Sequence, residues 1–174
     1  MDTDVEVVKP LDQFLQLSGF SGFEQETLVP TGIMAAEKGH TLVGEWLEEY
    51  DSKSFLLPDG SLNQETNVVA ITRKMKELGL RLNNSLQTVC QFTFYPKDFF
   101  CPKSYADLKI YRTRNTHTIH HFAGSWLTEE EREAHRKNAK ALRRKKRRRR
   151  AKDLVKKIIG EKMYNRIKAR VKKN

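Results

Sequence analysis

The sequence predicts a mixed α/β domain followed by a basic helical tail. Runs of β-branched and aromatic residues alternate with two stretches whose apolar residues recur at helical spacing. Charge also divides the chain, because residues 1–127 carry 12 Lys and Arg against 16 Asp and Glu, whereas residues 128–174 carry 21 against 6. We therefore expect a globular portion over residues 1–127 and a separate tail over residues 128–174.

The first predicted elements are short. A β-branched run at Val5–Val8, stopped by Pro10, predicts a strand, and residues 11–17 predict a short helical or turn segment. The segment Gly19–Phe23 is rich in glycine and aromatic residues, which predicts a strand edge or a loop. Residues 32–36 are mostly apolar, and we expect them to be buried.

Two amphipathic helices are expected next, over residues 40–50 and 65–78. In each helix the apolar residues fall on one face, and Gly79 stands where the second helix should end. After them, the run Val89–Tyr95 predicts one strand. Few strands alternate with helices, and such a thin set of elements is typical of part of a domain. Further extended segments are expected at residues 110–111 and 116–122.

Asp2 and Asp4 precede the first predicted strand. Residues two apart in an extended segment point to the same side, so the two carboxylates would repel unless a cation or water lies between them. A hard cation such as Mg²⁺ or Mn²⁺ takes one or two carboxylates and completes its shell with diphosphate oxygens. The alternative is a solvated terminal segment, because two Asp at this spacing are common by chance.

His120 and His121 are the second candidate for metal ligation. Adjacent side chains on a strand face opposite ways, so one histidine at most can reach a given metal. Gly124 after the pair permits a tight turn, and Trp126 offers an aromatic wall. The alternative for the two histidines is a structural role, and the alternative for Gly124 and Trp126 is core packing.

Several segments together resemble the sugar-transferring domain of glycosyltransferase family 32, a group with bacterial capsule and polysaccharide enzymes. Thr118-Ile119-His120-His121-Phe122-Ala123-Gly124-Ser125-Trp126 is the most specific of them. Asp2-Thr3-Asp4-Val5-Glu6-Val7-Val8-Lys9-Pro10-Leu11 resembles the metal-binding strand of that family. The resemblance covers nearly all of residues 1–127, and its remaining segments are residues 31–40, 66–68, 95–96 and 100–102.

This resemblance implies a GT-A-like fold and a metal-dependent, anomer-retaining glycosyltransferase. The donor would be a nucleotide sugar, usually a UDP-sugar, and the acceptor a glycan or a lipid-linked acceptor in polysaccharide biosynthesis. Asp2 and Asp4 match the metal-binding pair, and His121, or else His120, matches a histidine that approaches the cation, Mn²⁺ or Mg²⁺. The substrate-binding residues implied are Thr31, Gly32, Gly124 and Trp126.

The chain departs from the family ahead of Asp2, where a nucleotide-binding half normally stands. We therefore expect residues 1–127 to be the C-terminal portion of a catalytic domain, inactive as a fragment. The rival hypothesis is a noncatalytic protein that acts through its basic tail.

The tail begins with a helix start signal at Thr128, followed by acidic residues and Glu131. Apolar residues at helical spacing from Leu154 to Val171 form a stripe that Gly160 weakens. We expect an amphipathic helix that binds an anionic membrane surface; nucleic-acid binding and a solvated tail are the alternatives. The polyanion-binding residues expected are Arg143, Arg144, Lys145, Lys146, Arg147, Arg148, Arg149 and Arg150.

The sequence shows no apolar run of the ~20 residues that a membrane-spanning helix needs. It also shows no secretory signal at its start. We therefore expect a cytoplasmic protein that lies peripherally on the inner face of the cell membrane.

Overall fold

A computed structural model of the protein describes residues 1–63, 65–125 and 127–171, with side chains as far as residue 166. The chain divides into two compact units, one of residues 1–105 and 109–123 and the other of residues 106–108 and 124 onward. Strands and helices make the first unit, and two helices, one of them 31 residues long, make the described part of the second. The expected mixed α/β class is confirmed.

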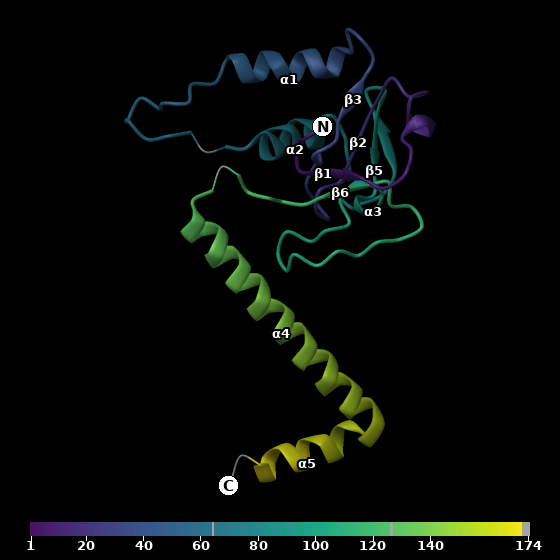
Figure 1. Cartoon of the computed structure of the whole chain (residues 1–174), viewed down its shortest axis with the longest axis vertical. Coiled ribbons are helices and arrows are strands. Elements are labelled where there is room, and N and C mark those ends of the chain that lie inside the picture. The colour runs from purple at the N-terminus through teal and green to yellow at the C-terminus, as the bar shows by residue number, and fades with distance from the viewer. Residues whose placement is uncertain (64, 126, 172–174) are drawn as a thin grey trace. The chain divides into compact units, whose positions relative to one another are not determined.

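A mixed four-stranded sheet forms the centre of the first unit (Figure 1). Its order is β3 (Ala35–Ala36), β2 (Gly19–Gly22), β5 (Phe92–Tyr95) and β4 (Gln87–Val89), and only the β2–β5 pairing is parallel. The prediction of a strand edge or loop for β2 was wrong, because β2 is an inner strand. Gly19 permits this, since a Cβ there would lie 2.5 Å from the Phe92 ring.

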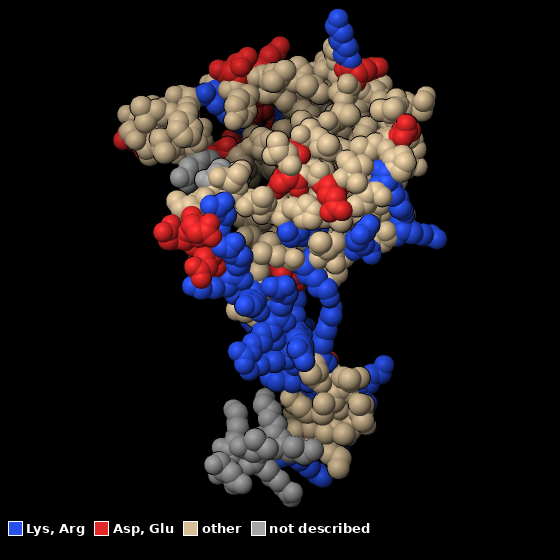
Figure 2. Space-filling view, in the orientation of Figure 1, with Lys and Arg blue, Asp and Glu red and all other residues tan. Residues whose placement is uncertain are grey.

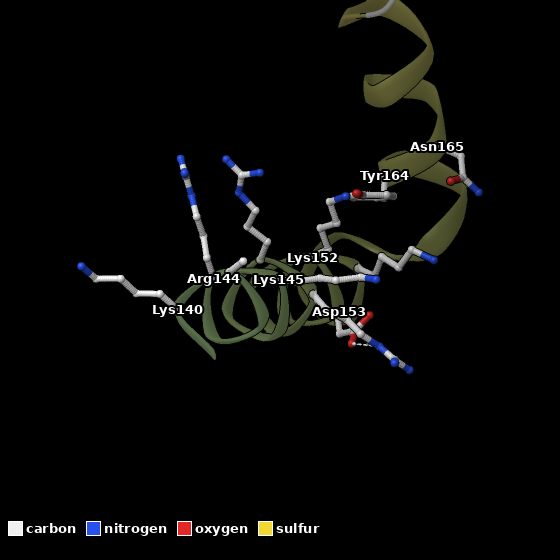
Figure 3. Close-up of a pocket in the computed structure, with 11 residues that line it drawn as sticks. Lys140, Arg144, Lys145, Lys152, Asp153, Tyr164 and Asn165 are labelled. Carbon is white, nitrogen blue, oxygen red and sulfur yellow. Dashed lines mark ion pairs between the residues drawn. The ribbon is translucent and has the colours of Figure 1, made fainter. Parts of the chain in front are cut away.

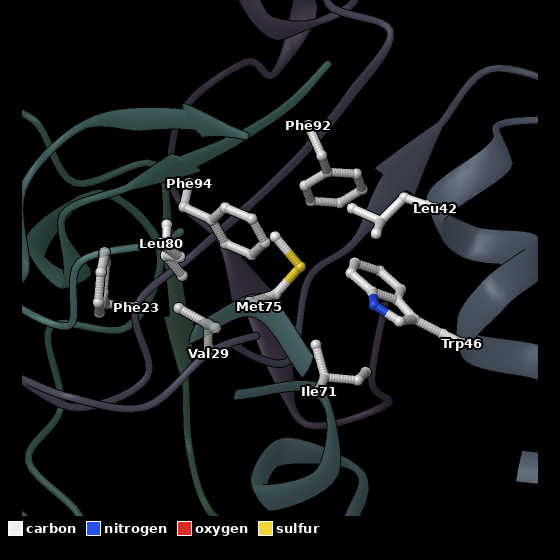
Figure 4. Close-up of a cluster of buried hydrophobic side chains, with 9 residues drawn as sticks. All are labelled: Phe23, Val29, Leu42, Trp46, Ile71, Met75, Leu80, Phe92 and Phe94. Atoms are coloured by element: carbon white, nitrogen blue, oxygen red, sulfur yellow. The ribbon is translucent and has the colours of Figure 1, made fainter. Parts of the chain in front are cut away.

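Helices α1 (Thr41–Asp51) and α2 (Asn67–Glu77) confirm the two predicted amphipathic helices. Thr66 caps α2 by accepting a hydrogen bond from the Val69 N–H. Figure 4 shows Met75 at the centre of the core that the two helices form with the sheet, among the aromatic rings. The buried members of this core are Phe23, Val29, Leu42, Trp46, Ile71, Met75, Leu80, Phe92 and Phe94.

A second core brings together the 3₁₀ turn η1 (Asp12–Phe14), strand β2 and helix α3 (Lys97–Phe100). The ring of Phe14 lies 5.0 Å from that of Phe100 and 5.2 Å from that of Phe20. Such close aromatic contacts bury large apolar area. The turn η1 agrees with the prediction for residues 11–17, whereas α3 was not predicted.

The sequence predicted one strand over Val89–Tyr95, and this was wrong, because the segment lies across a hairpin. Val89 ends β4 and pairs with Phe92, which begins β5. Between them Cys90 and Gln91 have φ angles of 49° and 62°. Positive φ at both central residues is the geometry of a two-residue hairpin turn, which reverses the chain.

A separate two-stranded pairing joins the two ends of the first unit. Strand β1 (Val5–Val7) pairs antiparallel with β6 (Thr118–His120), and Val5 stands opposite His120. Both strands fall within predicted extended segments, the β-branched run at residues 5–8 and the segment at residues 116–122. Their pairing carries Asp2 and Asp4, which lie just before β1, to the C-terminal end of β6.

The second unit contains α4 (Glu129–Ile159) and α5 (Glu161–Val171). The predicted helix start is confirmed, because Thr128 and Glu131 form a reciprocal capping box. Gly160, with φ of 79°, ends α4, so the predicted apolar stripe is shared between two helices. Every described helix is too short or too polar to span a lipid bilayer.

Candidate metal centre

Asp2, Asp4 and His120 meet beside the β1–β6 pair. One ligand atom from each residue lies within 4.8 Å of the other two. His120 Nε2 lies 3.3 Å from Asp4 Oδ1 and 3.8 Å from Asp2 Oδ2. The two aspartates that the sequence predicted as metal ligands are therefore brought together with one of the two candidate histidines.

His121 was the first choice as metal ligand from the sequence, but the structure places His120 beside the aspartates. The two side chains leave the strand on opposite faces, as adjacent strand residues must. His121 points toward Glu6, and its Nε2 lies 2.9 Å from Glu6 Oε2. His120 is buried, whereas the His121 side chain is 40% exposed. Of the two candidate histidines, His120 is therefore the one that lies with the aspartates.

Backbone hydrogen bonds hold the two aspartates in place. The Ala123 N–H donates to Asp4 Oδ2 at 2.7 Å, and the His121 N–H donates to the Asp4 carbonyl at 2.9 Å. The Asp2 N–H donates to the Gly32 carbonyl at 2.8 Å. The Asp4 side chain is 23% exposed and that of Asp2 is 61% exposed. Asp4 is therefore fixed, while the Asp2 carboxylate can adjust to a ligand.

Gly32 forms the floor of the cluster. A Cβ at this position would lie 2.9 Å from Asp2 Oδ2 and 3.1 Å from His120 Nδ1. Both separations are tighter than ordinary van der Waals contact, so a side chain here would push the Asp2 carboxylate aside and press on the His120 ring. The sequence predicted Gly32 as a substrate-binding residue, and the structure places it against the candidate metal ligands.

Two further residues belong to this site and were not predicted. The Glu24 carboxylate, whose side chain is 13% exposed, lies 3.7 Å from His120 Nδ1. The Phe122 ring lies 4.3 Å from the His120 ring. At 3.7 Å the Glu24 carboxylate lies beyond hydrogen-bond distance of Nδ1, so it acts on the ring through its charge, which raises the basicity of the imidazole. The one sequence signal for Glu24 is its position as an acidic residue directly after a buried aromatic segment.

Charges around His120 set its protonation. Burial lowers the His120 pKa, but Glu24 beside Nδ1 and the carboxylates of Asp4 and Asp2 raise it, and the net pKa lies above the usual histidine value. Nearby, burial lowers the pKa of Lys103, and the charge of Asp4 partly opposes this. Lys103 Nζ donates to the His121 carbonyl. A surplus of negative charge therefore surrounds the imidazole, which favours a cation at this position.

The geometry of the cluster fits a six-coordinate divalent cation. Mg²⁺ binds oxygen at about 2.1 Å, so opposite ligands around it stand about 4.2 Å apart. Ligand atoms already within 4.8 Å of one another need to move by only a fraction of an ångström. The exposed Asp2 carboxylate can supply that movement. Three protein ligands leave open positions for water or for the oxygens of a bound anion.

The other predicted substrate-binding residues lie in different surroundings. Thr31 is 5% exposed, and its backbone N–H donates to the Ser21 hydroxyl, so it supports the Gly32 segment from within the protein. Gly124 belongs to the second unit, has φ of 61° and makes the expected tight turn, in which its carbonyl accepts from the Leu127 N–H. Trp126 lies outside the described residues.

Comparison with protein-family models, with curated proteins and with solved structures gives no match to this chain. The chemistry of the site therefore follows from its own residues: two carboxylates, an imidazole and a carboxylate behind it. This donor set suits Mn²⁺ or Mg²⁺ better than a soft metal, because no thiolate is among the ligand atoms described here.

Proposed function

We propose that Asp2, Asp4 and His120 hold a divalent cation, Mn²⁺ or Mg²⁺, and that this site binds the diphosphate of a nucleotide sugar. The observation that carries the proposal is the mutual approach of three ligand atoms within 4.8 Å, beside a glycine at which a Cβ would press on Asp2 and His120. Carboxylate and imidazole ligands fill part of the cation's shell, and diphosphate oxygens complete it.

The proposed reaction is transfer of the sugar, from a UDP-sugar as donor, to a hydroxyl of a glycan or lipid-linked acceptor within a GT-A-like fold. Its support is the resemblance to glycosyltransferase family 32 together with the meeting of the resembling segments. Asp2, Gly32 and His120 come from three such segments, far apart in the sequence, and they touch in space. A bound cation would stabilise the negative charge on the diphosphate as the glycosidic bond breaks.

The protein's own residues would prepare the site for this ligand. Asp4 is held by the Ala123 N–H, so one carboxylate is oriented before the ligand arrives. Glu24 lies on the Nδ1 side of His120, which leaves Nε2 facing the aspartates. The exposed Asp2 can close onto the ion last.

Calorimetric titration of the 174-residue chain with UDP, with and without Mn²⁺, tests this function. We expect UDP binding that requires the cation and is lost when Asp2→Asn and Asp4→Asn are combined. The matched control is Glu6→Gln, because Glu6 is also a carboxylate of the β1 segment but faces His121. UDP binding without Mn²⁺, or binding that survives the double substitution, would overturn the proposal.

A further inference from the structure

The second unit carries a strongly cationic surface that the metal site does not use. Residues 143–159 contain eleven Lys and Arg and one acidic residue, Asp153. Every residue from 143 to 150 is exposed. Figure 2 shows Lys and Arg side chains gathered over the middle of α4. Such a dense array of one charge sign attracts a polyanion.

Exposed apolar side chains follow these cations at the end of α4. Leu154 is 60% exposed, Val155 42% and Ile158 73%, and Met163 at the start of α5 is 57% exposed. Transfer of large aliphatic side chains out of water is favourable, by roughly 25 cal/mol for each Å² of apolar surface. A binding partner for this surface must therefore offer apolar volume as well as negative charge.

The cationic and apolar residues share one face of α4. Arg144, Arg148, Ala151, Val155 and Ile158 are separated by four, three, four and three residues, which is the spacing of a single helical face. From Arg144 to Ile158 this face is about 21 Å long. It is cationic in its first half and apolar in its second half, so one flat partner can meet both halves together.

A groove between α4 and α5 extends the cationic surface. Its volume is about 930 Å³, and its lining includes Lys140, Arg144, Lys152, Lys156 and Tyr164. Figure 3 shows several of these cations extending from one side of α4, with Tyr164 of α5 on that side. Lys156 Nζ lies 5.5 Å from the centre of the Tyr164 ring. Cations around an amphipathic aromatic ring suit phosphate groups at a boundary between water and apolar chains.

We propose that α4 and the start of α5 form a docking surface for an anionic lipid membrane. The apolar residues at the end of α4 enter the boundary between headgroups and acyl chains, and the basic residues neutralise the lipid phosphates. Duplex nucleic acid would satisfy the cations but leave Leu154, Val155 and Ile158 in water. The exposed apolar residues therefore decide between the two polyanions in favour of the membrane. This inference does not depend on the metal site.

Co-sedimentation of the full chain with vesicles tests the proposal. We expect binding to vesicles of mixed phosphatidylcholine and phosphatidylglycerol, and much weaker binding to phosphatidylcholine alone. Combining Leu154→Gln with Ile158→Gln should weaken vesicle binding about tenfold or more, because two apolar side chains no longer enter the lipid. Binding of the same variant to random duplex DNA, which depends on charge, should stay unchanged.

Leu47→Gln is the matched control, since Leu47 is also a helical leucine and is 61% exposed, but lies in α1. It should leave vesicle binding unchanged. Glutamine is a good helix former, and circular dichroism checks that α4 persists in the variants. Ile158→Trp provides a second test that keeps a large apolar side chain at this position. Its tryptophan fluorescence should shift to the blue when the protein binds anionic vesicles.

Three results would overturn the proposal. The first is duplex DNA binding without vesicle binding, which would assign the surface to nucleic acid. The second is vesicle binding that the double glutamine variant does not weaken. The third is an Ile158→Trp fluorescence that vesicles do not change.

Discussion

Gly32 is the residue at which the smallest change should disable the site. In Gly32→Ala the new Cβ would stand 2.9 Å from Asp2 Oδ2 and 3.1 Å from His120 Nδ1, so at least one ligand must move. Substitutions in the outer shell, which holds the ligands in place, typically weaken metal binding about 10- to 100-fold. We expect a loss of Mn²⁺ affinity of that size, measured by titration, without a loss of folding.

Gly44→Ala is the matched control for this substitution. Gly44 lies inside α1, and a Cβ there would meet no heavy atom within 4 Å. Alanine in a helix interior is favoured over glycine by about 1 kcal/mol, so this variant should be more stable and bind Mn²⁺ normally. Equal Mn²⁺ affinity in Gly32→Ala and Gly44→Ala would refute the role of Gly32.

The protonation of His120 should make the metal-free protein sensitive to pH. Its folded pKa is raised above the ordinary value of 6.5, because Glu24, Asp4 and Asp2 outweigh burial. A raised pKa means that this stabilisation is fully present below the unfolded pKa of about 6.5 and is lost as pH rises through the folded pKa. Urea denaturation at several pH values should show wild type losing stability relative to His120→Gln on going from acid to alkaline pH.

The comparison of wild type with His120→Gln can also contradict this prediction. Wild type and His120→Gln share every other titrating group, so the difference in their free energies of unfolding isolates the histidine. If that difference stays constant across the pH range, the three carboxylates do not act on His120 in the way that the distances indicate.

Local sequence could identify the residue types of the site but not the complete set. Two Asp two positions apart and a His pair are visible as motifs. The choice between His120 and His121 depends on the register of β1 against β6, where Val5 stands opposite His120. Register is a long-range property, and a slip by one residue would exchange the two faces. Glu24 reaches His120 only through tertiary packing, so no spacing in the chain reveals it.

At the scale of the elements, Thr128 should control the start of α4. Its hydroxyl accepts from the Glu131 N–H at 3.2 Å, and Glu131 Oε2 accepts from the Thr128 N–H at 2.8 Å. Thr128→Ala removes the first bond and should destabilise the helix start by about 1 kcal/mol. The expected result is lower helicity by circular dichroism, with Thr128→Ser retaining the wild-type signal. Equal helicity in the alanine and serine variants would contradict this role.

The elements that sequence predicted well are those with local signals. The helices α1 and α2 follow from apolar periodicity, and α4 follows from its capping box. The β4–β5 hairpin was missed because Cys90-Gln91 is not one of the usual turn pairs, which contain Asn, Asp or Gly. A continuous apolar run therefore looked like one strand until tertiary pairing folded it back.

At the scale of the whole molecule, the two units should respond separately to substitution. Phe94 is fully buried in the core of the first unit, so Phe94→Ala should destabilise that unit by about 3–5 kcal/mol. Urea denaturation followed by near-ultraviolet circular dichroism measures this loss. Leu47→Ala, at an exposed position, is the control and should change little.

The second unit gives the other half of this prediction. Its membrane docking depends on residues of α4 and α5, so Phe94→Ala should leave vesicle binding unchanged. Vesicle binding that falls together with the stability of the first unit would contradict separate roles.

The charge division between residues 1–127 and 128–174 was visible in the sequence, whereas the inclusion of residues 106–108 in the second unit was not. Asp107 belongs there because it is buried and pairs with Lys146 at 2.6 Å, a contact across the chain that no local pattern encodes.

One measurement tests the central claim most directly: electron paramagnetic resonance titration of Mn²⁺ into wild type, His120→Gln and His121→Gln. The two histidines are neighbours in the sequence, but His120 reaches Asp4 whereas His121 reaches Glu6. We predict a Mn²⁺ site in wild type that His121→Gln retains. Because His120→Gln removes a ligand, it should weaken the site by at least the roughly 10- to 100-fold that is typical of losing an outer-shell partner. Equal affinities in the two variants, or a loss confined to His121→Gln, would contradict the assignment of Asp2, Asp4 and His120 as the metal centre.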